Sequence, residues 1–302
     1  MRYITFVGFL GLFSLGSVAL AQQQVMYSQY MFNTLAINPA YAGSHEDLSV
    51  TALMREQWVG LDGAPSTQTI SAHLPFEKKR IGVGLMAIHD QIGVSDQTDV
   101  YASYAYKIPL QHGSLALGLQ GGFSYYKAMF SEVSSTDPTF QGVDIRQFLP
   151  NFGAGIYYST RRFYAGLSIP QMIQSRLDDG NVVSKSKIIR HYFVHSGYVF
   201  DLSPSLKLKP NVLMKVVDGA PIEFDLNANL YLHDMVGLGL SWRSMDAVVL
   251  MLQVQITDRL QFGYAYDFGT TALRQTHAGS HELFLNYRFA LSKSRIITPR
   301  YF

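Results

Sequence analysis

The chain has 302 residues, of which 48% are hydrophobic, and its formal net charge at pH 7 is only +2. This charge balance does not indicate a basic surface for nucleic acid, and the absence of cysteine excludes disulfides, thiolate metal sites and a lipid-modified N-terminal cysteine. A chain of this length can form two ordinary globular domains or one membrane β-barrel.

The N-terminus has the pattern of an export signal. Met1 and Arg2 precede an apolar run that continues to Leu20, and Ala19-Leu20-Ala21 offers a small-residue cleavage site. The sequence therefore predicts a signal peptide over residues 1–21 that is removed. A transmembrane anchor is the alternative, because the run approaches the lower length limit of a spanning helix. No other stretch of the sequence is apolar for long enough to span a membrane as a helix.

Residues 22–47 are polar and aromatic but too irregular for a membrane-spanning strand. They include the runs Tyr27 to Asn33 and Asn38 to Gly43. Unstructured tails seldom contain so many aromatic residues. We therefore expect this segment either to plug a barrel lumen or to dock a periplasmic partner, with a solvated leader as the simpler alternative.

About fourteen stretches between residues 48 and 290 alternate apolar and polar residues with a period of two. The expected strands are 48–58, 67–75, 80–89, 97–109, 113–126, 150–159, 162–169, 189–200, 205–217, 222–233, 235–243, 247–257, 259–269 and 281–290. One face of the last stretch carries Leu283, Leu285, Tyr287 and Phe289. Its other face carries Glu282, Phe284, Asn286 and Arg288. Because side chains alternate between the faces of a strand, one face can meet lipid and the other a polar lumen.

This pattern predicts an all-β fold, a transmembrane antiparallel outer-membrane β-barrel of about 14 strands over residues 48–290, followed by a C-terminal tail at 291–302. Outer-membrane lipid is therefore an expected partner. A water-soluble β-sandwich is the alternative, but it would not need so many tyrosines and phenylalanines near strand ends.

The connections between the expected strands alternate between short and long. Those after even-numbered strands are tight, and we expect them to face the periplasm. The three longest follow odd-numbered strands, at 127–149, 170–188 and 270–280, and we expect these to face the cell exterior.

The expected lumen contains charges of both signs. Lys207, Lys209 and Lys215 share one face of a strand, and Glu223 and Asp225 share one face of the next strand, so opposite charges can pair across the sheet. Pro210 interrupts the first of these strands. Because proline lacks an N–H donor, we expect a bulge or a local break there.

Patterns that could indicate catalysis or metal binding are weak. Glycine pairs at 82–84, 153–155 and 237–239 lie inside strand patterns without a following helix, which favours close packing over a dinucleotide loop. On one face of a strand, His191 and His195 would stand about 13 Å apart, too far to share a metal ion.

Asp90, Asp96 and Asp99 are expected in or beside one outer loop. Their carboxylates could bind calcium, although solvated carboxylates are the simpler interpretation. No serine, histidine and aspartate have a recognised catalytic spacing. The sequence thus predicts no catalytic residue, no cofactor and no metal.

A series of short motifs runs through nearly the whole chain. In chain order they are Gln29-Tyr30-Met31-Phe32-Asn33, Asn38-Pro39-Ala40-Tyr41-Ala42-Gly43, Arg55-Glu56-Gln57-Trp58, Gly63-Ala64-Pro65, Asp90-Gln91-Ile92-Gly93, Trp242-Arg243, Gly263-Tyr264-Ala265-Tyr266-Asp267 and Gly279-Ser280-His281-Glu282. Together they resemble the PorP/SprF family of Bacteroidota outer-membrane proteins. The resemblance implies a non-enzymatic barrel of the type IX secretion system.

The resemblance also implies partners. Family members are associated with secreted cargo that bears a C-terminal sorting domain, including gliding adhesins, or with core machinery that includes a periplasmic peptidoglycan-binding lipoprotein. We expect the outer loops 127–149 and 170–188 to present a surface to cargo, and the N-terminal segment or the periplasmic turns to contact the machinery. The candidate partner-contact or structural residues are Asn38, Pro39, Tyr41, Gly43, Arg55 and Trp58.

Two other functions stay open at this point. A diffusion porin or hydrophobic-solute transporter predicts an open or ligand-lined lumen, and a surface enzyme predicts a catalytic constellation. The sequence favours neither, because it shows no lumen ring dominated by one sign of charge and no catalytic motif.

Overall fold

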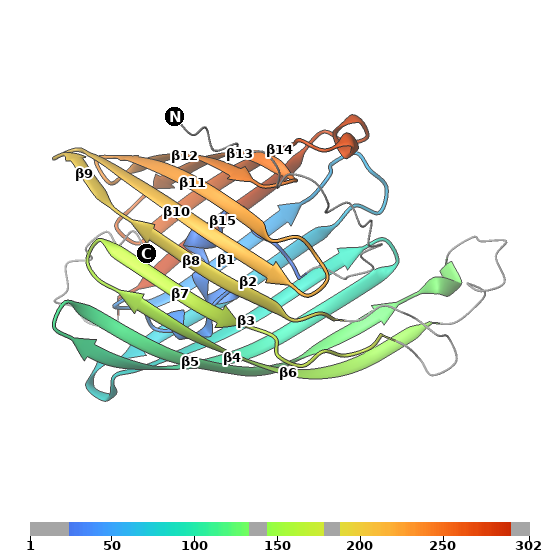
Figure 1. The fold of residues 1–302 in the computed structure, drawn as a ribbon, viewed down its shortest axis with the longest axis horizontal. Helices are drawn as coiled ribbons and strands as arrows, with labels where there is room; N and C mark the ends of the chain where they lie inside the picture. Colours follow the sequence, from blue (N-terminus) through green and yellow to red (C-terminus); the bar gives the residue numbers. More distant parts are fainter. Residues whose placement is uncertain (1–23, 133–143, 178–187, 291–302) are drawn as a thin grey trace, which may run out of the picture.

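A computed structural model describes residues 24–132, 144–177 and 188–290 (Figure 1). The predicted signal peptide, the predicted C-terminal tail and the middle of two long connections lie outside these ranges.

The described chain forms one closed antiparallel β-barrel. Its strands are β1 (Leu48–Glu56), β2 (Ser66–Phe76), β3 (Ile81–Ile92), β4 (Ser95–Leu110), β5 (Gly113–Ala128), β6 (Ile145–Ser159), β7 (Phe163–Ile169), β8 (His191–Tyr198), β9 (Phe200–Ser203), β10 (Leu206–Val217), β11 (Glu223–Leu232), β12 (Val236–Arg243), β13 (Ala247–Gln255), β14 (Leu260–Gly269) and β15 (Ser280–Phe289). Pairing of β1 with β15 joins the two ends of the sheet. Strands β8 and β9 pair one after the other with the same edge of β10, so together they count as one strand of the wall. The wall therefore has 14 strands, as predicted.

The two faces of each strand have the predicted environments. In β15, Leu283 and Leu285 on the outer face are 42% and 45% exposed, whereas Glu282 and Phe284 on the inner face are 0% and 1% exposed. The apolar outer face forms the surface that lipid covers in a membrane barrel.

The predicted ends of β5 and β6 are wrong, because both strands extend beyond the apolar outer surface that faces lipid. Pairing continues to Ala128 and Ile145, so the predicted loop 127–149 is shorter and β6 begins five residues before the predicted start. Figure 1 shows this hairpin projecting beyond the rest of the barrel. Outside the membrane neither face of a strand must be apolar, so the period-two signal fades although the hydrogen bonds continue.

The same effect makes the predicted ends of the strands 80–89 and 97–109 wrong. Strand β3 runs to Ile92 and β4 begins at Ser95, so Asp90 lies in β3 while Asp96 and Asp99 lie in β4. The three carboxylates are therefore held on a paired ladder instead of gathered in a loop.

The break expected at Pro210 does not interrupt β10 itself. It lies in the pairing of β10 with β8 and β9. Strand β10 continues through Pro210 and stays paired with β11. On its other side, pairing with β8 ends at Asn211, β9 takes over at Leu208, and the register shifts between Leu206 and Lys207. This matches the missing N–H donor of proline, which removes one ladder bond.

The N-terminal segment, residues 24–47, lies inside the barrel. Three short 3₁₀ helices form within it: η1 (Tyr30–Phe32), η2 (Thr34–Ala36) and η3 (Pro39–Tyr41). Figure 1 shows this blue segment between the walls. Most of its side chains are buried and none is exposed, and they pack on the inward-facing side chains of the strands to form the core.

Candidate functional site in the barrel lumen

The N-terminal segment runs through the lumen from one end of the barrel to the other. We call these the long-loop end, where the three longest connections lie, and the short-turn end. Residues 24–26 line a cavity at the long-loop end with Trp58 and Leu273. Gly43, near the other end of the segment, packs against Pro75 at the short-turn end. The chain then enters the wall at β1.

Asn38 and Pro39 fix the middle of the segment to the wall. The Asn38 side chain accepts a hydrogen bond from the backbone N–H of Ala40 (3.0 Å) and donates one to the carbonyl of Ile156 (3.0 Å). Its amide nitrogen also lies 3.2 Å from Nε2 of His195. Pro39 occupies the first turn of η3, where its missing N–H costs nothing. The motif thus builds a tight turn that is bonded to the barrel.

The wall leaves room for this turn because it carries glycine there. A Cβ atom on Gly118 would lie 2.2 Å from the backbone nitrogen of Ala40, and one on Gly155 would lie 2.1 Å from Oδ1 of Asn38. Any side chain at these positions would displace η3. This is the close packing that the glycine pair at 153–155 predicts.

Tyr41 and Gly43 are also internal. The Tyr41 hydroxyl lies 3.2 Å from Nε2 of His45, and its ring makes an edge contact with His73 at a centroid distance of 5.4 Å. Gly43 has a φ of +67°, and a Cβ atom there would lie 2.7 Å from Cα of Gly82. Both the left-handed backbone and the close approach require glycine.

A buried ionic network lies nearer the long-loop end. Arg55 of β1 bonds Asp267 of β14 (2.7 Å) and Glu282 of β15 (3.1 Å). Arg243 of β12 bonds Asp225 of β11 (3.2 Å) and Asp267 (3.4 Å). All five side chains are almost fully buried, so each charge depends on the others for compensation.

This network holds the start of the segment. The Glu282 carboxylate accepts the backbone N–H of Ser28 (2.8 Å) and that of Gln29 (2.8 Å). The Ser28 hydroxyl donates to Asp267 (2.8 Å) and accepts from Arg55 (2.8 Å). The Glu282 carboxylate therefore holds the backbone of the segment, while Asp267 and Arg55 hold the Ser28 hydroxyl.

Sequence reasoning singled out Arg55 but missed Asp267 and Glu282 as its partners. The available signal was the inward face shared by the two carboxylates on adjacent strands, which the alternation pattern identifies. The register of β1 against β15, which pairs Arg55 with Glu282, could not be read from the sequence.

Buried hydroxyl groups of the segment add further contacts with the wall. The side-chain amide of Asn227 donates to the Tyr30 hydroxyl (2.9 Å), and the Tyr27 hydroxyl lies 2.7 Å from that of Thr69.

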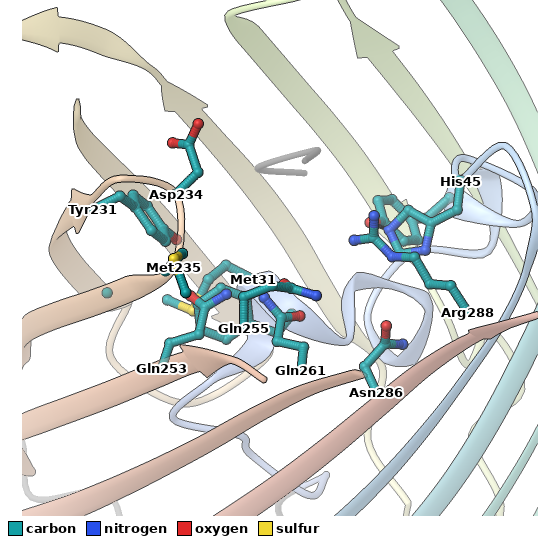
Figure 2. Close-up of a pocket in the computed structure, with 13 residues that line it drawn as sticks. Met31, His45, Tyr231, Asp234, Met235, Gln253, Gln255, Gln261, Asn286 and Arg288 are labelled. Carbon is teal, nitrogen blue, oxygen red and sulfur yellow. Dashed lines mark hydrogen bonds between the residues drawn. The ribbon is translucent and has the colours of Figure 1, made fainter. Parts of the chain in front are cut away.

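The fit between the segment and the wall leaves little space at the short-turn end. A cavity of about 30 Å³ lies there, lined by Met31 and by amide side chains such as Gln253 and Asn286. Figure 2 shows these lining residues. That volume holds about two water molecules. It leaves no room for a solute.

Trp58 differs from the other candidate residues. It lies in the β1–β2 connection with a φ of +48°, its backbone N–H donates to the Ser280 hydroxyl (3.2 Å), and its ring lies 6.3 Å from that of His277. It is half-buried at the long-loop end. A role in contacting a partner stays a prediction for all six candidates, and only Trp58 lies where a partner could reach it without displacing the segment.

Cross-strand charge pairing is confirmed for one predicted pair. Lys215 bonds Glu223 at 2.5 Å. Lys207 instead bonds Asp234 in the β11–β12 turn (2.7 Å), and Lys209 lies over the ring of Tyr164 at 5.6 Å.

The histidines and aspartates that could suggest a metal site have other contacts. His191 is hydrogen-bonded to the carbonyl of Ile189 (2.9 Å), the Thr67 hydroxyl donates to Asp90 (2.5 Å), and Asp99 accepts from Gln97 (2.9 Å). Within residues 24–132, 144–177 and 188–290, no group of three or more histidines and carboxylates is arranged to hold a metal ion. Among the same residues, no helix is long and apolar enough to cross a membrane.

Comparison with solved structures gives outer-membrane proteins of low sequence identity. The outer membrane protein Omp33 of Acinetobacter baumannii matches with a TM-score of 0.48 and 11% identity, over 82% of this chain and 100% of that one. The NanC porin matches with a TM-score of 0.42 and 10% identity (81% and 100%), and the KdgM porin with a TM-score of 0.39 and 11% identity (80% and 99%). A comparison with curated protein sequences gave no significant match.

Comparison with protein families shows the family to which the chain belongs. The family described as type IX secretion system membrane protein PorP/SprF matches residues 19–287, which include both the segment in the lumen and nearly the whole barrel. The protein therefore belongs to the PorP/SprF family of type IX secretion system membrane proteins and is an outer-membrane β-barrel.

Proposed function

We propose that the protein is a non-enzymatic docking barrel of the type IX secretion system, which retains secreted cargo at the cell surface and contacts periplasmic machinery. The observation that carries this proposal is the lumen filled by the N-terminal segment and its bonds from Ser28 to Glu282 and Asp267. A barrel closed in this way offers its two ends as surfaces instead of offering a passage.

The two ends are suited to different partners. In outer-membrane barrels the turns on the periplasmic side are short and the external loops are longer. On this basis the long-loop end faces the exterior, and the connections 129–144 and 170–190 present the surface for cargo with a C-terminal sorting domain. A gliding adhesin is one such cargo.

We assign the short-turn end to the periplasmic partner. The sequence predicts that either the N-terminal segment or the periplasmic turns contact the machinery. Burial of the segment inside the lumen favours the turns. The turns carry exposed basic side chains, among them Lys78, Lys79 and Arg161, beside fewer exposed carboxylates such as Glu77 and Asp258. They form a surface for a peptidoglycan-binding lipoprotein with an acidic face.

The test replaces the connections 129–144 and 170–190 with short turns, one at a time and together. Cargo retention is measured by immunoblotting of cells and medium, and barrel insertion by heat-modifiable gel migration. We expect cargo to move into the medium while insertion is unchanged. A matched variant with a substituted short turn, Asp258→Asn in the β13–β14 turn, should retain cargo. Full retention in the loop variants would refute docking through these loops.

A diffusion porin is the competing function. It requires a continuous aqueous passage, whereas the lumen of the described residues is occupied by buried side chains of the segment. This observation favours docking over solute transport.

A further inference from the structure

We propose that the cavity at the long-loop end is a receptor for a segment of a partner polypeptide that carries a basic side chain beside an apolar one. This inference rests on the proposed function, because it assumes that the long-loop end faces the exterior. The cavity has a volume of about 540 Å³, which is within the range of ligand-binding clefts. Residues 24–26 form part of its lining.

The charge of the cavity lining favours a cation. Three carboxylates, Asp90, Glu223 and Asp246, line the cavity together with one guanidinium, that of Arg243. Glu223 is 24% exposed at its side chain and Asp246 is 47% exposed, so an incoming group can reach both.

The network beneath the cavity does not neutralise this charge. Arg243 is shared between Asp246 and two buried carboxylates, Asp225 and Asp267. When the groups that line the cavity are counted with their ion-paired neighbours, carboxylates outnumber cations two to one. The carboxylates are Asp90, Glu223, Asp225, Asp246, Asp267 and Glu282, and the cations are Arg55, Lys215 and Arg243. A positively charged group from outside would reduce this excess.

Apolar side chains surround the same cavity. Met245 is 59% exposed, Leu273 is 48% exposed and Ile92 is 45% exposed, and all three line the cavity. The cavity therefore combines apolar side chains with a few polar groups, as ligand-binding clefts do. The stem of a lysine or arginine, with an apolar neighbour, would cover both kinds of surface at once.

The same chemistry argues against other occupants. Lipid phosphates, acidic glycans and nucleic acid are anionic, so the carboxylate excess would repel them. The described residues hold no cluster arranged for a metal ion. A polypeptide supplies a cation and apolar side chains within a few ångströms of each other.

The test is photo-crosslinking in cells that contain the whole secretion system. A photoreactive amino acid is placed at Met245, and the crosslinked peptide is identified by mass spectrometry. The matched control is Met235, which is equally exposed at 59% but lies at the short-turn end. We expect the Met245 position to capture a surface polypeptide through a peptide that contains a lysine or arginine beside an apolar residue, and the Met235 position not to capture it.

Charge variants test the role of the carboxylates. Asp246→Asn should lower the crosslinking yield at Met245 about fivefold, and Asp246→Glu should keep it near the original level. Heat-modifiable migration checks that each variant is a folded barrel.

The other outcomes would contradict the receptor proposal, each for a different reason. Capture of cargo at Ser131 in the β5–β6 connection but not at Met245 would refute the cavity as a receptor and leave the docking function standing. Adducts to residues that precede Gln24 of the same chain would mean that the protein fills its own cavity. Adducts to lipid or glycan would also refute it. If a strain that lacks this protein retained all cargo, the docking function itself would be wrong.

Discussion

Arg55 is the side chain on which the packing of the lumen depends most directly. We predict that Arg55→Met destabilises the barrel by about 3–5 kcal/mol, because it leaves Glu282 buried without its cation and Asp267 with only the longer bond to Arg243. Urea unfolding of protein reconstituted in lipid measures the change. The control is Arg162→Met, which removes an exposed ion pair with Asp201 and should change the unfolding free energy far less. Equal effects from the two substitutions would contradict the importance of the buried network.

Gly118 gives a second test at the scale of one residue. We predict that Gly118→Ala lowers the unfolding free energy by about 1–3 kcal/mol, because the new methyl group collides with the backbone of Ala40. Gly121→Ala on the same strand is the matched control, since a Cβ atom there meets nothing within 4 Å. The same unfolding assay compares them. A stable Gly118→Ala protein would mean that η3 is not held against β5.

The N-terminal segment is the element that distinguishes this barrel. Its direction predicts that Val25, at the long-loop end, is reached from outside the cell. The chain has no cysteine, so Val25→Cys introduces a single thiol. A membrane-impermeant maleimide should label it on intact cells, whereas Lys78→Cys in the β2–β3 turn should react only after the outer membrane is permeabilised. Labelling of Lys78→Cys but not of Val25→Cys on intact cells would mean that the barrel has the opposite orientation.

Most strands could be predicted from the sequence, whereas the sequence could not decide whether the N-terminal segment plugs the lumen or docks a partner. Strand faces such as those of β15 follow from alternation, because lipid imposes an apolar residue at every second position. The ends of β3, β5 and β6 extend beyond that constraint, so the pattern there is lost while the pairing continues.

The contacts of the segment depend on pairing between distant parts of the chain. Ser28 meets Glu282 across 254 positions of sequence. The aromatic content of residues 22–47 predicts that they pack against something. It does not say whether the partner is the barrel or another protein, and the closed wall is needed to identify Asp267 and Glu282 as the receptor.

The whole molecule is an outer-membrane barrel that encloses part of its own chain. The wall is joined by pairing of β1 with β15, and the lumen is filled by a segment bonded to several strands. One end then offers a cavity and long connections, and the other offers short basic turns. This arrangement suits a protein that links partners on two sides of a membrane without opening a path between them.

The most direct test of the closed lumen is ion conductance in a planar lipid bilayer. The account predicts no stepwise openings from the intact protein. A variant in which residues 24–43 are replaced by a glycine and serine linker of equal length should conduct, because such a linker cannot fill the lumen. Heat-modifiable migration confirms that both barrels are folded. Stable porin-like openings from the intact protein would contradict the account and favour a transport pore.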